Sequence, residues 1–176
     1  MGKANIHYQE SRIQHPASSI QSQAFTPTEA FAKIQKYCAY QERSHQEVKY
    51  KLYSYGLYSS DVNELISRLI TENFLNEERF AKAYAGGKFR MKKWGKNKIE
   101  HKLESLGLTK NCITRGLKEI DTTDYTKTLR SLIKKKAAEV SEENPFAKRN
   151  KVARFVISKG YEPEVVWETV KDLMAD

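Results

Sequence analysis

Apolar positions recur along this chain in three blocks that share one pattern. Each block contains a short segment with a glycine next to its end: Lys51–Leu57, Lys102–Leu108 and Phe155–Tyr161. The three glycines are 51 and 53 residues apart. An internal period of this length indicates that one small structural unit is repeated, and such arrays offer an extended surface rather than one closed pocket.

The register of apolar residues extends beyond these segments. It includes the positions eight and four residues before each glycine and six, ten and thirteen residues after it. In that order, the three copies carry Val48, Ile99 and Val152; Leu52, Leu103 and Val156; Val62, Ile113 and Val166; Ile66, Leu117 and Val170; and Leu69, Ile120 and Leu173. Steps of four match one face of a helix. Each block therefore predicts a helix, a glycine break and a second helix.

A further helix is predicted before each pair. Thr26–Glu29 has the Thr cap, the proline and the glutamate that are typical of a helix start. Asn76 is placed to cap the equivalent helix of the second block, and Thr123 or Asp124 that of the third. Ser44–Glu47 forms another capping box. The other predicted helix starts are marked by Gly95, Thr109 and Pro163.

These patterns predict an all-α protein of three tandem three-helix repeats. We place the repeats at residues 25–73, 74–121 and 122–176, with residues 1–24 as a mobile polar tail. The tail is rich in Gln, Ser and His and lacks a helical period. A unit of about 50 residues has a weak core on its own, so neighbouring repeats are expected to support one another.

The sequence does not indicate an enzyme or an exported protein. Cys38 and Cys112 are 74 residues apart and lack metal-ligand spacing, so we interpret both as small buried apolar residues. The histidines are scattered, and no catalytic set or phosphate-binding loop is recognisable. We therefore expect no catalytic residue, no metal and no cofactor. Without a signal peptide or membrane span, the cytoplasm is the default location.

The charge is unevenly distributed. The chain has a net charge of +9, with 10 basic and 9 acidic residues up to position 85 but 21 and 13 from position 86 onward. This asymmetry predicts an anionic partner for the second and third repeats.

Two clusters hold the cations that we predict to bind DNA or a DNA–protein filament. They comprise Lys88, Arg90, Lys92, Lys93, Lys96, Lys98 and Lys102 in the second repeat, and Lys148, Arg149, Lys151 and Arg154 at the equivalent helix of the third. The alternative for any such run is a solvated helix face. The near absence of acidic residues in the first cluster and its echo in the third repeat favour phosphate contacts, which read little sequence and weaken with salt. For Lys134–Lys136, beside three glutamates, we prefer the solvated face.

Two other features leave alternatives open. Trp94 could stack on an unpaired base, or it could plug the joint between helices, which we prefer. The helix–glycine–helix unit is similar to a helix-turn-helix, but its second helices carry few cations, so reading of a specific DNA sequence is disfavoured.

Several of these segments together resemble one known family. Gln41–Val48, then Asn73–Ala81, then Trp94-Gly95 with Ile99, Leu103 and Gly107, resemble the RecX regulatory proteins, bacterial modulators of the RecA recombinase. The resemblance runs from about Thr28 to Leu173. Its most specific part is the Phe-Leu-Asn-x-x-Arg-Phe-Ala segment. Arg79 lies in that segment, and either a contact or a structural pairing with Glu77 or Glu78 is open to it.

The resemblance implies a non-enzymatic regulator with an elongated, curved, solenoid-like shape. Family members lie along the groove of the RecA–DNA filament and inhibit its growth or promote its disassembly. For this chain the resemblance implies a RecA filament as partner, together with single- and double-stranded DNA bound independently of sequence. The sequence itself indicates no membrane partner and no oligomer interface, so a monomer is the default. Two alternatives are a sequence-independent DNA-binding protein that acts without a recombinase and a helical adaptor for another acidic protein.

Overall fold

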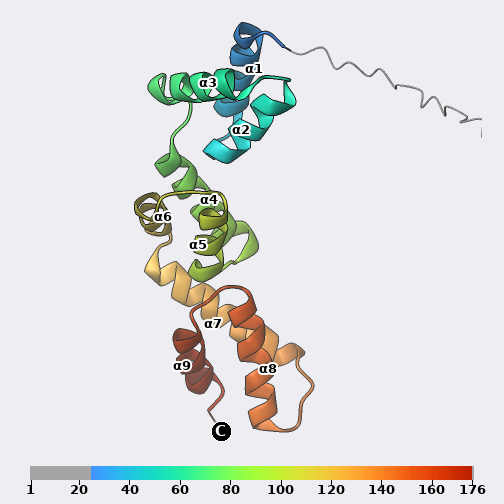
Figure 1. Cartoon of the computed structure of the whole chain (residues 1–176). Coiled ribbons are helices and arrows are strands. Elements are labelled where there is room, and N and C mark those ends of the chain that lie inside the picture. Colours follow the sequence, from blue (N-terminus) through green and yellow to red (C-terminus); the bar gives the residue numbers. More distant parts are fainter. Residues whose placement is uncertain (1–24, 176) are drawn as a thin grey trace, which may run out of the picture.

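The computed structural model describes residues 25–175, and over that range it contains nine α-helices and no strand. The helices are α1 (Pro27–Tyr40), α2 (His45–Ser54), α3 (Ser59–Thr71), α4 (Glu77–Lys92), α5 (Lys96–Ser105), α6 (Lys110–Leu117), α7 (Thr122–Glu139), α8 (Pro145–Ser158) and α9 (Pro163–Leu173). They form an elongated column of three groups, α1–α3, α4–α6 and α7–α9 (Figure 1). The all-α prediction of three tandem three-helix repeats is confirmed. The expected mobile tail over residues 1–24 lies outside the described residues.

The internal repeat has a clear structural basis. Gly56, Gly107 and Gly160 end the turns after α2, α5 and α8 with φ of 84°, 79° and 94°, a left-handed conformation that favours glycine. The side chains eight and four residues before each glycine and six residues after it are at most 2% exposed. Each repeat therefore packs the same positions of its second and third helices inward.

The helix starts follow the predicted caps with one exception. Thr26 and Ser44 form complete capping boxes, and the Asn76 side chain accepts a hydrogen bond from the Arg79 amide. The prediction of Thr123 or Asp124 as the cap of α7 is wrong, because Asp121 caps this helix. Its carboxylate accepts the amide hydrogen bond of Asp124 at 2.9 Å and so satisfies a free donor of the first turn.

The buried side chains form two separate apolar clusters. Residues of α1–α3, with Leu75 of the following linker, make one core, which includes Ile34 and Leu52. The second core runs continuously through α4–α9. The last two repeats thus share one interior, whereas the first has its own.

Tyrosines and glycines make the joint between the last two repeats. The rings of Tyr125 and Tyr161 stack with centroids 4.8 Å apart. The Gly95 amide donates to the Lys159 carbonyl at 2.9 Å, and a Cβ on Gly95 would lie 2.2 Å from backbone atoms of Gly160. Gly95 therefore starts α5, as predicted, and also lets two backbones touch.

The Tyr125 hydroxyl links three segments at this joint. It donates to the Glu162 carboxylate at 2.6 Å and accepts from the Lys96 amide at 3.0 Å. Burial, followed by the hydrogen bond to Glu162, raises the pKa of Tyr125 well above its ordinary value. Burial likewise raises the pKa of Tyr161. Both rings are therefore neutral at physiological pH.

Polar contacts join the first repeat to the second. The Arg79 guanidinium donates to Glu42 at 2.8 Å and to the side chain and carbonyl of Asn73 at 2.6 and 2.9 Å. The pairing with Glu77 or Glu78 that the sequence left open is not formed. Glu78 instead pairs with Lys82 and Arg115, and the carboxylate of Glu77 lies 3.6 Å from His45. Arg79 has a structural role as a clasp between the first two repeats.

The two cysteines differ in burial. Cys38 is buried, and burial raises the pKa of its thiol to about 11, so it stays protonated and inert at neutral pH. Cys112 is only partly buried, so its predicted burial holds in part. Among the described residues, no helix is long and apolar enough to span a membrane, and no group of three or more His, Cys, Asp or Glu side chains is arranged to hold a metal ion.

Candidate functional site

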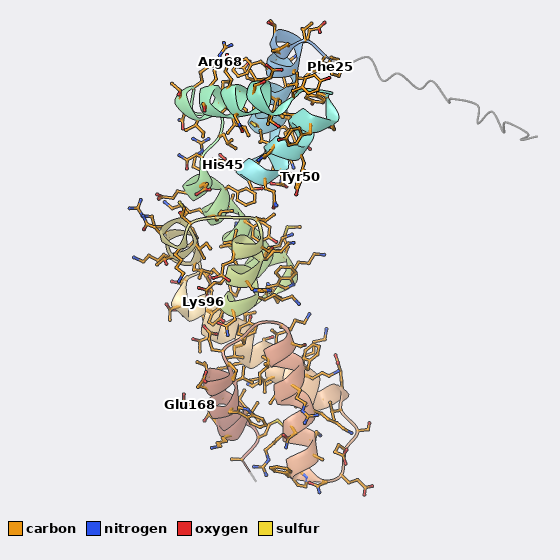
Figure 2. All side chains as sticks on the ribbon, in the orientation of Figure 1. Phe25, His45, Tyr50, Arg68, Lys96 and Glu168 are labelled. Carbon is orange, nitrogen blue, oxygen red and sulfur yellow. The ribbon has the colours of Figure 1, made fainter. Side chains whose placement is uncertain are left out.

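The predicted cations of the second repeat surround the turn between α4 and α5. The helix α4 ends at Lys92, and Lys93 follows in the left-handed conformation with φ of 54°. Gly95 then starts α5, whose first turn contains lysines and no acidic residue. Figure 2 places Lys96 where the middle and last repeats meet.

This arrangement is electrostatically one-sided. Lysines near the C-terminus of α4 are favourable there, but Lys96 and Lys98 stand at the positive end of the α5 dipole. Each cation at such a position is unfavourable by about 0.3–1 kcal/mol at low salt. A bound anion would remove this penalty, so the local helix electrostatics favour an anionic ligand.

The seven cations of this cluster are not neutralised within the protein. In the described part of the chain, none of them lies within 4.0 Å of a carboxylate. By contrast, Lys82, Arg115 and Arg130 each form an ion pair of 2.5–2.9 Å. The cluster is therefore available to an external anion.

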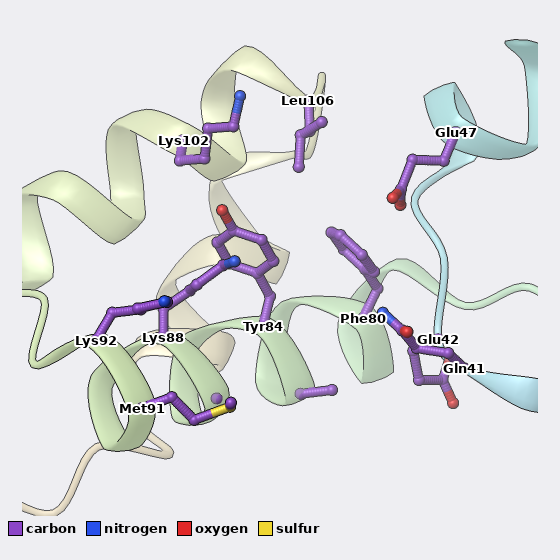
Figure 3. A pocket seen from close by; sticks show the side chains of 12 residues that line it. Gln41, Glu42, Glu47, Phe80, Tyr84, Lys88, Met91, Lys92, Lys102 and Leu106 are labelled. Carbon is purple, nitrogen blue, oxygen red and sulfur yellow. The ribbon is translucent and has the colours of Figure 1, made fainter.

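The cluster does not form one continuous patch, however. Lys88, Lys92 and Lys102 line a groove between the first and second repeats (Figure 3). Lys93 lines a separate shallow hollow against α7. Lys96 borders a third hollow at the end of α6. The left-handed backbone at Lys93 explains why two consecutive lysines serve different faces.

A second cationic face lies on α7, where the sequence pattern favoured a solvated face for Lys134–Lys136 and Lys127 was not considered. Lys127, Lys134 and Lys135 line a shallow hollow of about 520 Å³, and Lys127 also borders the hollow of Lys93. Lys136 pairs with Glu139 at 3.3 Å and so fits the solvated-face interpretation. A signal for this face was present in the sequence. Lys127 and Lys134 are seven residues apart, which is two helical turns, and so lie on the side of the helix opposite to its apolar residues.

Trp94 occupies the joint next to these cations. Its side chain is partly buried and packs against the core that the last two repeats share. The Nζ atoms of Lys88 and Lys98 lie 5.6 and 5.0 Å from its ring. These contacts favour a packing role for Trp94 at the joint between the helices. Base stacking by Trp94 stays a prediction, and it would require Lys88 and Lys98 to move away from the ring.

The predicted cations of the third repeat lie on α8 in mixed surroundings. Lys151 pairs with Glu142 at 2.6 Å, and the Arg149 Nε atom lies 3.4 Å from the Pro145 carbonyl. Lys148 is half-buried and Arg154 is exposed. The cations of the third repeat therefore resemble the second-repeat cluster less in the structure than in the sequence, because some of them already contact other groups of the protein.

Comparison with known proteins identifies both later repeats. Residues 76–117 match the RecX second three-helix domain, and residues 123–170 match the RecX third three-helix domain. The regulatory protein RecX of Clostridium tetani (strain Massachusetts / E88) is 29% identical over 134 residues, which are 75% of this chain and 59% of that protein. The regulatory protein RecX of Clostridium perfringens (strain 13 / Type A) is 30% identical over 122 residues, 68% of this chain and 57% of that protein. The chain thus spans less than two thirds of these relatives.

Solved structures support the same fold. The crystal structure of RecX from Lactobacillus salivarius superposes with a TM-score of 0.75 at 22% identity, over 84% of this chain and 96% of that one. A second crystal structure, of a regulatory protein RecX, has a TM-score of 0.75 at 18% identity, over 83% of this chain and 71% of that one. Because the two matched domains together cover just over half of the sequence, the chain belongs to the RecX family of regulatory proteins.

Proposed function

We propose that this protein is a non-enzymatic regulator of homologous recombination and DNA repair that binds the RecA–DNA filament and inhibits its growth or activity. The observation that carries the proposal is the set of unpaired cations on the middle repeat of an elongated array. An extended molecule can contact several successive subunits of a filament, and several weak contacts on one chain add up to high avidity. A monomer in the cytoplasm fits this role.

In this proposal the phosphate contacts come from the later repeats. Lys93, Lys96 and Lys98 approach the backbone of filament-bound DNA, together with the α7 face of Lys127 and Lys134. The first repeat is nearly neutral and contributes mainly protein contacts. Because lysines bind phosphate as point charges, these contacts do not depend on the base sequence.

A second candidate function is sequence-independent DNA binding without a recombinase. The same unpaired cations favour it, since they would bind the phosphates of free DNA equally well. The two candidates differ in the partner and so predict different affinities. A filament regulator binds the RecA–DNA filament more tightly than naked DNA at matched salt, whereas a plain DNA-binding protein does not.

The decisive experiment titrates the protein into strand exchange and DNA-dependent ATP hydrolysis by the cognate RecA. Binding to naked DNA is measured beside it at the same salt concentration. Loss of both activities at substoichiometric protein supports the filament regulator. No effect on either activity, together with tight binding to naked DNA, favours the second candidate.

A charge-reversal variant tests the residues. Changing Lys92, Lys93, Lys96 and Lys98 to Glu should abolish inhibition while circular dichroism shows unchanged helix content. The matched control reverses four exposed lysines elsewhere, Lys36, Lys49, Lys110 and Lys171, and so alters the net charge equally. Inhibition that survives the first variant, or is lost equally in the control, rules the predicted cluster out as the specific site.

A further inference from the structure

A groove of about 580 Å³ lies between the first two repeats, and the proposed contacts with DNA do not account for it. Its floor is α4, one wall is α5, and the opposite wall is the segment that joins α1 to α2 (Figure 3). Phe80, Tyr84 and Met91 line the floor, and Leu106, the residue directly after α5, lines the wall on that side. The groove therefore has an apolar floor and is built from two repeats.

The apolar lining is open to a ligand at Met91. Met91 is 80% exposed, and apart from the neighbouring backbone of α4 itself no atom lies within 4 Å of the position that a Cβ on Gly87 would take, which leaves the α4 backbone accessible. Met side chains adapt to many apolar partners and are common at peptide-binding surfaces. An exposed Met beside a bare glycine in a groove indicates a docking surface for an apolar side chain.

The two ends of the groove carry opposite charges. Lys88, Lys92 and Lys102 project from α4 and α5 at one end, and none of them has a carboxylate within 4.0 Å among the described residues. Glu42 and Glu47 stand at the other end. Glu42 is held by Arg79 at 2.8 Å, and Glu47 accepts the hydrogen bonds of the Ser44 cap at 2.8 and 3.0 Å. The lysines thus lack acidic partners, whereas each acid already accepts at least one hydrogen bond. The second carboxylate oxygen of Glu42 is buried without a partner among the described residues, which disfavours a further anion at that end.

These observations favour a peptide over a nucleic acid strand. A uniformly anionic backbone that followed the groove would meet Glu42 and Glu47. The floor also offers little for base stacking, because Phe80 is only 5% exposed and the Nζ atom of Lys88 lies 4.9 Å from the centre of the Tyr84 ring. A peptide can instead place an apolar side chain at Met91 and its carboxylates at the lysine end alone.

We infer that this groove docks a segment of a partner protein in which hydrophobic side chains adjoin a run of Asp and Glu. The inference rests on the proposed function only for the identity of the partner. According to this inference, the lysines of the cationic cluster have two different functions. Lys88, Lys92 and Lys102 contact protein, while Lys93 and the α7 face contact phosphate.

The test uses the full chain and model peptides. The first peptide carries two leucines followed by a run of Asp and Glu, the second has Asn and Gln in place of those acids, and a short oligothymidylate represents nucleic acid. The chain has three methionines, so labelling their methyl carbons gives a simple NMR spectrum. Met91 reports on the groove, and Met174, which packs against the core of the later repeats, is an internal control.

The acidic peptide is expected to shift the Met91 methyl signal and leave that of Met174 in place. In fluorescence anisotropy, Lys92→Glu should weaken this peptide about tenfold, and Met91→Ala should weaken it several-fold. The control Lys134→Glu makes the same charge change outside the groove and should alter the affinity by less than about twofold. Both altered groove residues are exposed, so loss of the fold does not confuse the result.

Three outcomes would overturn the inference: no shift of Met91 with the acidic peptide, an equal shift with the Asn and Gln peptide, or a shift with oligothymidylate alone. The last outcome would assign the groove to nucleic acid. The recombinase assay is scored separately. If Met91→Ala loses the peptide but inhibits RecA fully, the peptide site is real but is not used on the filament, and the proposed function stands.

Discussion

At the joint between the second and third repeats, two tyrosine rings stack while their hydroxyl groups have opposite surroundings. The Tyr125 hydroxyl bridges the Lys96 amide and the Glu162 carboxylate, whereas the buried hydroxyl of Tyr161 has no hydrogen-bond partner among the described residues. Tyr125→Phe strands two polar groups and should lower the free energy of unfolding by about 1–3 kcal/mol. Tyr161→Phe removes an unsatisfied group and should be neutral or raise it by about 1 kcal/mol. Urea titration of both variants checks this, and equal losses would contradict it.

The glycines offer a second test at the scale of single residues. A methyl group on Gly95 would overlap the Gly160 backbone at 2.2 Å, whereas a methyl group on Gly107 would meet no atom within 4 Å other than those of its chain neighbours. Gly95→Ala should therefore destabilise the chain by about 3 kcal/mol through overpacking at the joint. Gly107→Ala carries only the strain of φ +79°, about 1 kcal/mol. Urea unfolding measures both. Similar losses for the two variants would mean that the backbones at the joint separate easily.

At the scale of helices, the features that the sequence predicts correctly are those set by interactions between residues close together in the chain. The recurring apolar positions and the caps at Thr26, Ser44 and Asn76 specify helices through interactions within a few residues, and the structure has them. Arg79 shows the limit. Two acidic residues precede it directly, yet its partner Glu42 is 37 residues away, because the packing of repeats decides which charges meet.

The candidate site shows the same limit. The sequence places Lys92 and Lys93 together, but the left-handed turn between α4 and α5 sends them to different faces. The α7 face unites lysines from different turns of one helix with a lysine of the preceding repeat, and no local pattern reveals that neighbour. The composition of the sequence therefore showed which region is cationic, whereas only the fold shows that its lysines lie on separate faces.

The separate cores predict two cooperative units. The first repeat has its own buried cluster and is joined to the second by the Arg79 clasp, whereas α4–α9 share one interior. A three-helix core is weak alone, so α1–α3 should open at a lower urea concentration than α4–α9. Native-state hydrogen exchange measures this. We expect amides of α4–α9 to lose protection together and those of α1–α3 earlier, and a single common midpoint for all nine helices would refute the two units.

For the whole molecule, the separation of faces predicts how salt affects binding. The affinity for DNA falls with the logarithm of the salt concentration, with a slope of about 0.7 for each phosphate contacted on a single strand. If Lys93 and Lys134 contact phosphate, reversing both should reduce the slope for oligothymidylate by about 1.4. Reversing Lys88 and Lys102, which line the groove, makes the same charge change and should leave the slope nearly unaltered.

Comparing the two double variants separates the loss of a local phosphate contact from the weaker long-range attraction between DNA and the whole protein. Because the chain carries a net charge of +9, any charge reversal lowers the affinity somewhat through the long-range potential. That general effect acts equally on the two double variants, whereas a lost phosphate contact changes the number of released counterions and so the slope itself. Anisotropy titrations at several salt concentrations give the slopes. Equal slopes for the two variants would show that the middle repeat presents one undivided cationic surface, and a smaller slope for the Lys93 and Lys134 variant alone would place the DNA on the face shared with α7.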